Sequence, residues 1–256
     1  MANPFFANAT SIACDPTEKW DTYDFCCKEV GILPGPPALM IGIGFSGKTF
    51  FVQDFALSVT TGRKFLGAYP VKKGKVLHLD YENSTVQTKT RYRRLMHGGF
   101  LRPGAIQDGH LLVTQPTLKL DDEGCQAALE DALNGYTLCI VDSFRAAIKG
   151  DENASEVRQS LDVLGRASEK ANCSVIVILH SGKGAQSDNR FAARGSSALF
   201  DAAGTALTLS VKENIYTLRQ IKSRTGKLAD IRYAMRDSGD FVNEINATEG
   251  LSLVRL

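Results

Sequence analysis

The sequence has little that would mark a secreted, membrane-spanning or zinc-binding protein. No run of about 18 apolar residues occurs in its 256 residues, and its N-terminus lacks the basic start and the apolar stretch of a signal peptide. Its six cysteines form no CxxC pair and have no histidine at zinc-ligand spacing. The 30 basic and 28 acidic residues nearly balance, so any polyanion site must be local. We therefore expect a cytoplasmic protein, without membrane contact, whose cysteines are reduced.

The chain also lacks a linker rich in Pro, Gly or Ser, which predicts a single domain over residues 1–256. Within this domain we expect a core at 33–235. A lead-in at 1–32, which holds Trp20, is expected to form a short helix against the core, and residues 236–256 are expected to form a C-terminal tail.

Short β-branched runs alternate with helix-like stretches in the core. This pattern predicts an α/β fold with a mostly parallel central sheet and helices on both faces, extended by antiparallel strands at the C-terminal edge. The expected parallel strands are 38–41, 75–80, 138–142 and 174–179, the expected helices are 47–62, 84–98, 122–133 and 154–172, and the expected antiparallel strands are 204–211, 215–221 and 229–235.

A phosphate-binding loop is the strongest motif. Residues 42–49 match G-x-x-x-x-G-K-[ST] in full, between a predicted strand and a predicted helix. Its glycines let backbone N–H groups approach a phosphate, Lys48 offsets the β- and γ-phosphate charge, and Thr49 offers a hydroxyl to Mg²⁺. Phe45 is bulky for such a loop, and the sequence leaves open whether its ring packs beside the nucleotide or against the sheet. The expected nucleotide-binding residues are Gly42, Gly44, Phe45, Ser46, Gly47, Lys48, Thr49 and Phe50.

Acidic and imidazole side chains end the other predicted strands. Asp142 closes an apolar strand in the manner of a Walker B strand, whose carboxylate holds Mg²⁺. Asp80 and Glu82 are spaced by two, which a strand places on one face, so that one of them can orient the attacking water; a solvated strand end is the alternative. His180 follows the fourth strand, where it fits either a γ-phosphate sensor or a structural role.

Taken together, these motifs resemble the RecA-like P-loop ATPase superfamily, and most closely its RepA-type hexameric replicative DNA helicases, over roughly residues 33–235. The resemblance rests on four blocks in order. These are VLHLDYEN at 76–83, the Walker B strand with its trailing GDEN at 140–153, ILHSGKG at 178–184, and ARGSSAL at 193–199. It implies ATP hydrolysis, with ATP and Mg²⁺ bound.

The same resemblance assigns roles to individual residues, and this chain departs from the family's pattern at two places. It implies that Glu82 is the catalytic glutamate. Relatives often carry a second histidine where this chain has Ser181, and the plasmid helicase carries an arginine where residues 201–204 read Asp-Ala-Ala-Gly. Lys222 and Arg224 instead resemble the K-x-R pair that other members insert into a neighbouring subunit's nucleotide site, where a cation stabilises the γ-phosphoryl charge. A basic surface hairpin is the alternative.

Basic residues in the loops favour a nucleic-acid partner, although a solvated loop explains them equally well. The leading expectation is a ring-forming homo-oligomer, hexameric by resemblance, that binds single-stranded DNA and acts as a helicase. A non-helicase regulatory or recombinase-type ATPase acting on a protein partner stays open, and a metabolic kinase is a weaker alternative. The candidate nucleic-acid residues are Arg145, Lys149, Lys183, Arg190, Phe191 and Arg194.

Overall fold

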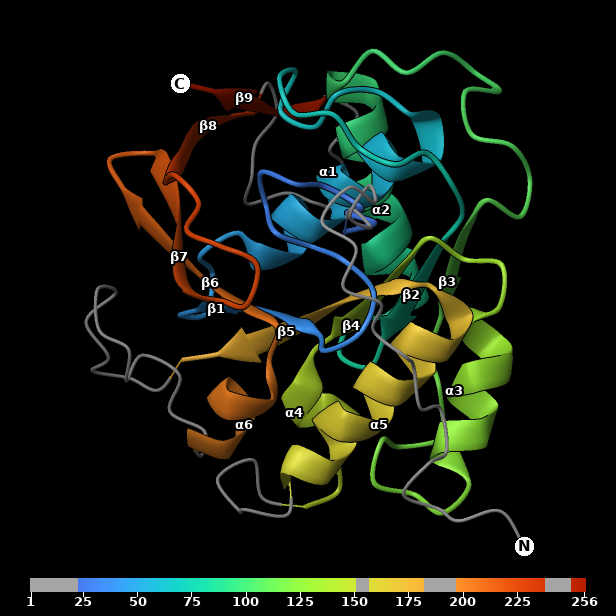
Figure 1. The fold of residues 1–256 in the computed structure, drawn as a ribbon. Coiled ribbons are helices and arrows are strands. Elements are labelled where there is room, and N and C mark those ends of the chain that lie inside the picture. The colour runs from blue at the N-terminus through green and yellow to red at the C-terminus, as the bar shows by residue number, and fades with distance from the viewer. Residues whose placement is uncertain (1–22, 151–156, 182–196, 238–249) are drawn as a thin grey trace, which may run out of the picture.

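The computed structural model describes residues 23–150, 157–181, 197–237 and 250–256. Within them the chain forms one nine-stranded sheet in the order β3-β2-β4-β5-β1-β6-β7-β8-β9 (Figure 1). The strands are β1 (Ala38–Gly42), β2 (Val76–Asp80), β3 (Leu111–Thr114), β4 (Leu138–Asp142), β5 (Ser174–His180), β6 (Thr205–Lys212), β7 (Ile215–Ser223), β8 (Ile231–Asp237) and β9 (Leu251–Arg255). The helices are α1 (Lys48–Thr61), α2 (Thr85–Gly98), α3 (Cys125–Leu133), α4 (Phe144–Ala147), α5 (Val157–Ala171) and α6 (Ser197–Ala202).

The sheet is parallel from β3 to β6 and antiparallel from β6 to β9. This confirms the predicted α/β class, with a parallel core and antiparallel strands added at the C-terminal edge. The parallel arrangement brings the carboxyl ends of β1, β2, β4 and β5 to one edge of the sheet, which is where α/β proteins bind ligands.

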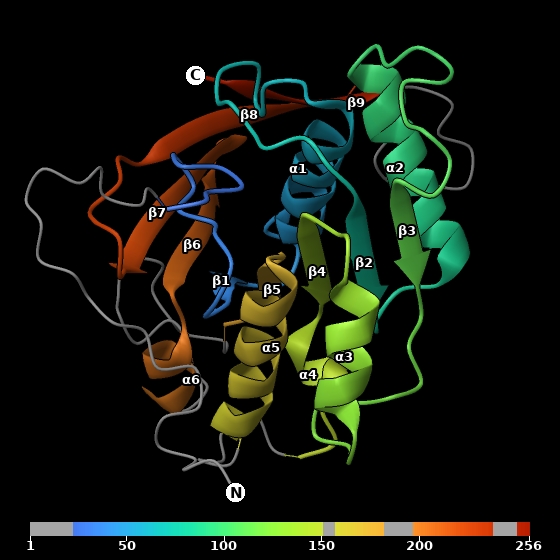
Figure 2. The ribbon, with the colours of Figure 1, turned by 45° about the vertical axis from the view of Figure 1, so that its right-hand side comes forward.

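Two hydrophobic cores cover the two faces of the sheet. Alternate residues of the central strands face opposite sides, as in Met40 against Leu39 and Ile41. In Figure 1, α1 and α2 lie above the sheet, and α3, α4, α5 and α6 lie below it. Figure 2 shows α3 and α5 side by side on their face of the sheet.

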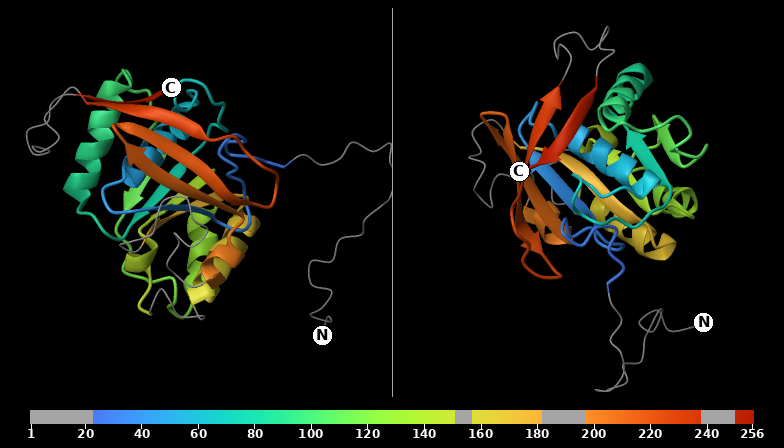
Figure 3. Two further views of the ribbon diagram at one scale, coloured as in Figure 1. Left: turned by 90° about the vertical axis from the view of Figure 1, so that its left-hand side faces the viewer. Right: turned by 90° about the horizontal axis from the view of Figure 1, so that it is seen from above.

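The antiparallel strands close around α1 and α2. The ring of Tyr233 on β8 lies 5.8 Å from that of Phe51 on α1, and β9 packs against α2 (Figure 3). A Cβ atom at Gly98 would lie 2.2 Å from the carbonyl oxygen of Leu251, so only glycine permits this approach of α2 to β9. The C-terminal strand is therefore part of the same hydrophobic core as α1.

Local sequence explains the ends of the two helices nearest the phosphate loop. Helix α1 follows Gly47 and ends at Gly62, both in the left-handed conformation. Helix α2 starts with a capping box, in which the Ser84 side chain accepts from the Gln87 N–H and the Gln87 side chain accepts from the Ser84 N–H.

Two strands, the short helices α4 and α6, and the lead-in differ from the sequence-based expectation. Strands β3 and β9 were not expected; both are short edge strands, and their pairing comes from tertiary context rather than from a long apolar run. The described part of the lead-in, residues 23–32, is not helical but makes a turn closed by a bridge between Cys27 and Ile32. Trp20 lies outside the described residues.

The described cysteines are buried and free, consistent with the expectation of reduced core residues. No helix in the described ranges has the length and apolar character needed to cross a bilayer.

Candidate functional site

The phosphate loop joins β1 to α1 and is shaped by close contacts at its glycines. A Cβ atom at Gly42 would lie 2.8 Å from the carbonyl oxygen of Leu209, and Gly47 has a φ of 83° and would place a Cβ atom 3.0 Å from the Tyr216 ring. Neither position accepts a larger residue without displacement. The loop therefore leads tightly into the N-terminus of α1, where backbone N–H groups and the helix dipole favour an anion.

Lys48 is buried at the start of α1. Its Nζ donates hydrogen bonds to the carbonyl oxygens of Gly42 at 2.8 Å and Ile43 at 2.7 Å. Burial lowers the pKa of Lys48 to about 8, although the carboxylates of Asp142 and Glu82 raise it. The ammonium group is thus held by two carbonyl oxygens of the loop and is stabilised by the charges of two carboxylates.

Asp142 and Thr49 form the second part of the site. The Thr49 hydroxyl donates to Oδ2 of Asp142 at 2.9 Å. Burial raises the pKa of Asp142 to about 7; the Thr49 hydrogen bond lowers it, and the charges of Asp80 and Glu82 raise it further. A buried carboxylate beside a threonine hydroxyl and a phosphate-binding loop is the donor set that Mg²⁺ takes with nucleotide phosphates, so these residues fit the implied ion.

The two candidate acids after β2 occupy different environments. β2 ends at Asp80, so Glu82 lies in the following turn rather than on the strand. Asp80 is 1% exposed, and its carboxylate accepts from the backbone N–H groups of Glu82 and Asn83 and from the Thr88 hydroxyl. The Glu82 side chain is 46% exposed. Of these two acids, only Glu82 has a carboxylate open to water.

His180 lies beside Glu82. Its Nε2 is 3.3 Å from Oε2 of Glu82, and the ring is partly exposed. His180 is also the register partner of Gly42 in the β1–β5 pair, and the Ser181 N–H donates to the Gly42 carbonyl oxygen at 3.0 Å. The structure therefore brings together the end of β5, the start of the phosphate loop and the turn after β2.

Comparison with known families agrees with this arrangement. Residues 28–186, more than half of the chain, match a family described as AAA domain. The chain belongs to this family. No curated protein sequence matches it significantly.

Solved structures share the fold of this AAA domain at low identity. One of them, described as an ATPase domain, matches 86% of this chain and 84% of its own, with 14% identity and a TM-score of 0.59. A DnaB-like replicative helicase, described with its interactions with primase, matches 77% of this chain but only 56% of its own, with 13% identity and a TM-score of 0.60. The RadB recombinase matches 80% of this chain and 89% of its own, with 18% identity and a TM-score of 0.56. The RecA-like fold expected from the sequence is confirmed, and the chain is a P-loop NTPase domain.

Phe45 and Phe50, the two aromatic residues of the loop region, differ in their exposure to solvent. Phe45 has a φ of 61° and a fully exposed ring, so it does not pack against the sheet, which was one of its two expected positions. The side chain of Phe50 is buried in the core of this AAA domain, with the guanidinium of Arg91 5.8 Å from its ring centroid. The Phe50 ring thus packs in the hydrophobic core, and its expected nucleotide contact stays a prediction.

The K-x-R pair at the end of β7 contacts its own chain. Lys222 Nζ donates to the carbonyl oxygens of Phe200 at 2.5 Å and Asp201 at 2.9 Å, and Arg224 Nη2 donates to that of Asp201 at 2.9 Å. These carbonyls end α6, where cations are favourable. Within one chain the pair thus caps a helix.

The candidate nucleic-acid residues are only partly described. Arg145 Nη1 donates to the carbonyl oxygen of Gly150 at 3.1 Å, and Lys149 forms an ion pair with Asp122. The remaining candidates lie outside the described residues: Lys183, Arg190, Phe191 and Arg194.

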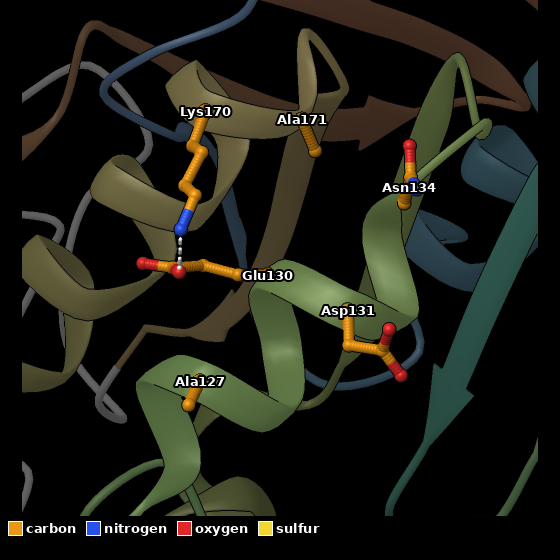
Figure 4. Close-up of a pocket in the computed structure, with 6 residues that line it drawn as sticks. All are labelled: Ala127, Glu130, Asp131, Asn134, Lys170 and Ala171. Atoms are coloured by element: carbon orange, nitrogen blue, oxygen red, sulfur yellow. Dashed lines mark hydrogen bonds and ion pairs between the residues drawn. The ribbon is translucent and has the colours of Figure 1, made fainter.

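A surface hollow of about 420 Å³ lies between α3 and α5 (Figure 4). The ion pair between Lys170 and Glu130, at 2.5 Å, spans it. None of the residues lining this hollow belongs to the candidate site described above.

Sequence reasoning missed Thr88 and Asn83, which hold Asp80. Thr88 donates its hydroxyl to Oδ2, and Asn83 donates both its backbone N–H and its side-chain Nδ2 to Oδ1. No spacing rule connects Thr88 to a strand end eight residues earlier, so the sequence carried no signal for this contact.

Proposed function

We propose that this AAA domain hydrolyses ATP with Mg²⁺, and that it works as a ring-forming, single-stranded-DNA-dependent motor of the RecA/RepA type, as a helicase in replication or recombination. The observation that carries the proposal is the group formed by Glu82, His180 and the Lys48 loop at one edge of the sheet. It combines an anion site, a cation and a water-accessible carboxylate, which phosphoryl transfer to water requires.

Each residue has a defined task in this proposal. The loop N–H groups from Gly42 to Thr49 bind phosphate, and Lys48 neutralises its charge. Asp142 and Thr49 would hold Mg²⁺, which supplies charge neutralisation when bound. Glu82 accepts the proton of the attacking water or orients it, since its carboxylate is exposed. His180 contacts that carboxylate and would report the state of the site to the chain that follows β5.

The proposed assembly and partner follow from the shared fold and from the basic residues of the chain. The fold is shared with a DnaB-like replicative helicase and with a further solved ATPase domain. We propose that Lys222 and Arg224 act on the nucleotide of a neighbouring copy, that Lys183, Arg190, Phe191 and Arg194 bind single-stranded DNA, and that copies of the whole chain, as a single domain, form a hexameric ring.

The fold shared with the RadB recombinase favours a second candidate, a recombinase-type or regulatory ATPase that does not unwind duplexes. The discriminating experiment measures ATP hydrolysis with and without single-stranded DNA, on protein whose mass is read by light scattering. Stimulation in a ring-sized species supports the motor. Hydrolysis by a DNA-indifferent monomer or dimer supports the regulatory ATPase, and the same background rate in wild type and Lys48→Ala overturns both.

A further inference from the structure

Asp80 anchors the turn that carries Glu82. Its Oδ1 accepts from the backbone N–H of Glu82 at 3.1 Å, the backbone N–H of Asn83 at 2.8 Å and the side-chain Nδ2 of Asn83 at 3.2 Å. Its Oδ2 accepts from the hydroxyl of Thr88 in the first turn of α2. A single buried carboxylate thus joins β2, the turn after it and the following helix.

The turn is held from its other side as well. The N–H of Tyr81 donates to the carbonyl oxygen of Asp142 at 2.7 Å, which ties the start of the turn to β4. Arg91 donates to Oδ1 of Asn83 at 2.9 Å, and Gln115 donates to the Asn83 carbonyl oxygen. The backbone at Glu82 therefore has a fixed place, while its side chain extends to His180.

The environment of Asp80 argues against a direct role in chemistry. A general base needs an oxygen within hydrogen-bond reach of water. Both oxygens of Asp80 already accept protein donors, and the residue is 1% exposed. The exposed carboxylate of Glu82, two residues later, meets that requirement.

We infer that Asp80 is a positioning residue that fixes the Glu82 backbone through an Asx-type turn, so that the Glu82 carboxylate stands in the place needed for water attack. This inference rests on the proposed function, because it presumes that Glu82 acts on water. It assigns the two neighbouring acids different roles, one mechanical and one chemical.

Two substitutions at the same position separate these roles. In Asp80→Asn, the amide oxygen can still accept the three N–H donors, and the amide nitrogen can donate to the Thr88 hydroxyl, which itself lies 3.2 Å from the Ser84 carbonyl oxygen. The turn then keeps its shape without the charge. Asp80→Ala removes every one of these bonds and releases the turn.

The expected result is a split between binding and turnover. Asp80→Ala should lower kcat about 100-fold, since a displacement of about 1 Å costs that much, while KM for ATP changes less than about twofold. Asp80→Asn should keep kcat within about fivefold of wild type. Glu82→Gln should lose turnover while still binding ATP.

Asp108 provides the matched control. It is an exposed aspartate that accepts the Gly109 N–H at 3.0 Å in a different loop, so Asp108→Ala should leave kcat unchanged. If Asp80→Ala does not bind a fluorescent ATP analogue, its site is damaged beyond the turn. The turnover of Asp80→Asn then tests the positioning role by itself.

Loss of turnover in Asp80→Asn as complete as in Glu82→Gln would overturn the positioning role while leaving the ATPase assignment intact. A wild type that does not hydrolyse ATP, or a Glu82→Gln variant as active as wild type, would instead overturn the proposed function and this inference with it.

Discussion

His78 should make the fold less stable in mild acid. Its ring on β2 is buried, with Nδ1 3.0 Å from the hydroxyl of Tyr92. Burial lowers the pKa of His78 from 6.5 to about 4, although the charge of Asp80 raises it. Between these pH values the imidazole is protonated in the unfolded chain but stays neutral in the folded chain. The stability that the folded state gains from burying neutral His78 is therefore fully present above about pH 6.5 and is lost as the pH falls towards 4.

The size of the effect follows from the shift. A lowering of about 2.5 pKa units, at about 1.4 kcal/mol per unit, corresponds to a loss of about 3 kcal/mol in the free energy of unfolding, of which about 2 kcal/mol is lost by about pH 5. This is a large part of the 5–15 kcal/mol typical of a folded domain.

Urea unfolding of wild type and His78→Gln at about pH 7.5 and about pH 5 measures this loss. The variant cannot take up the proton, so the stability difference between the two proteins should shrink by about 2 kcal/mol at the lower pH. Asp142 titrates in the opposite sense, because burial raises its pKa to about 7. The Asp142 contribution to the free energy of unfolding is the same in wild type and in His78→Gln, so it cancels when the two proteins are compared.

His97 supplies the control, since it is exposed on α2. His97→Gln should follow the wild-type stability at both pH values. A His78→Gln curve that runs parallel to wild type between about pH 7.5 and about pH 5 would refute the reasoning.

Three further predictions concern the proposed activity. Lys48→Ala should abolish ATP binding or hydrolysis, and normal turnover would remove the phosphate-site assignment. Glu82→Gln should keep ATP affinity in a binding titration while slowing hydrolysis at least about 100-fold; equal activity would show that another group orients water. Arg224→Ala subunits mixed with wild type should depress ATPase activity more than in proportion to their fraction, because each would impair a neighbour's site. A strictly proportional decline would indicate independent sites.

The continuous buried strands were predictable because their signal is local. β1, β2, β4 and β5 each consist of a run that is buried on both faces, and the sequence placed them to within a residue or so. β3 and β9 are four and five residues long with mixed burial, and they lie at the two edges of the sheet. Their existence depends on the neighbour that each one pairs with, which a short window of sequence does not contain.

The parts of the candidate site also differ in how far a local stretch of sequence predicts them. The phosphate loop is contiguous, so its pattern identified it directly. The meeting of Glu82 with His180 depends on strand order, because β4 lies between β2 and β5. Family resemblance favoured these two residues individually, but their 3.3 Å contact comes from the sheet.

The pair of acids after β2 shows where sequence reasoning stops. A spacing of two implies a shared face only while the strand continues, and β2 ends at Asp80. Beyond that point the chain turns back on the Asp80 carboxylate, which takes up the N–H groups that the strand no longer pairs. The carboxylate of Asp80, which ends the strand, is therefore fully hydrogen-bonded within the turn. The carboxylate of Glu82, within the turn, is the one open to water. The acidic pair at the end of β2 thus divides into an anchor, Asp80, and a water-accessible carboxylate, Glu82, because the backbone donors of the turn must be satisfied first.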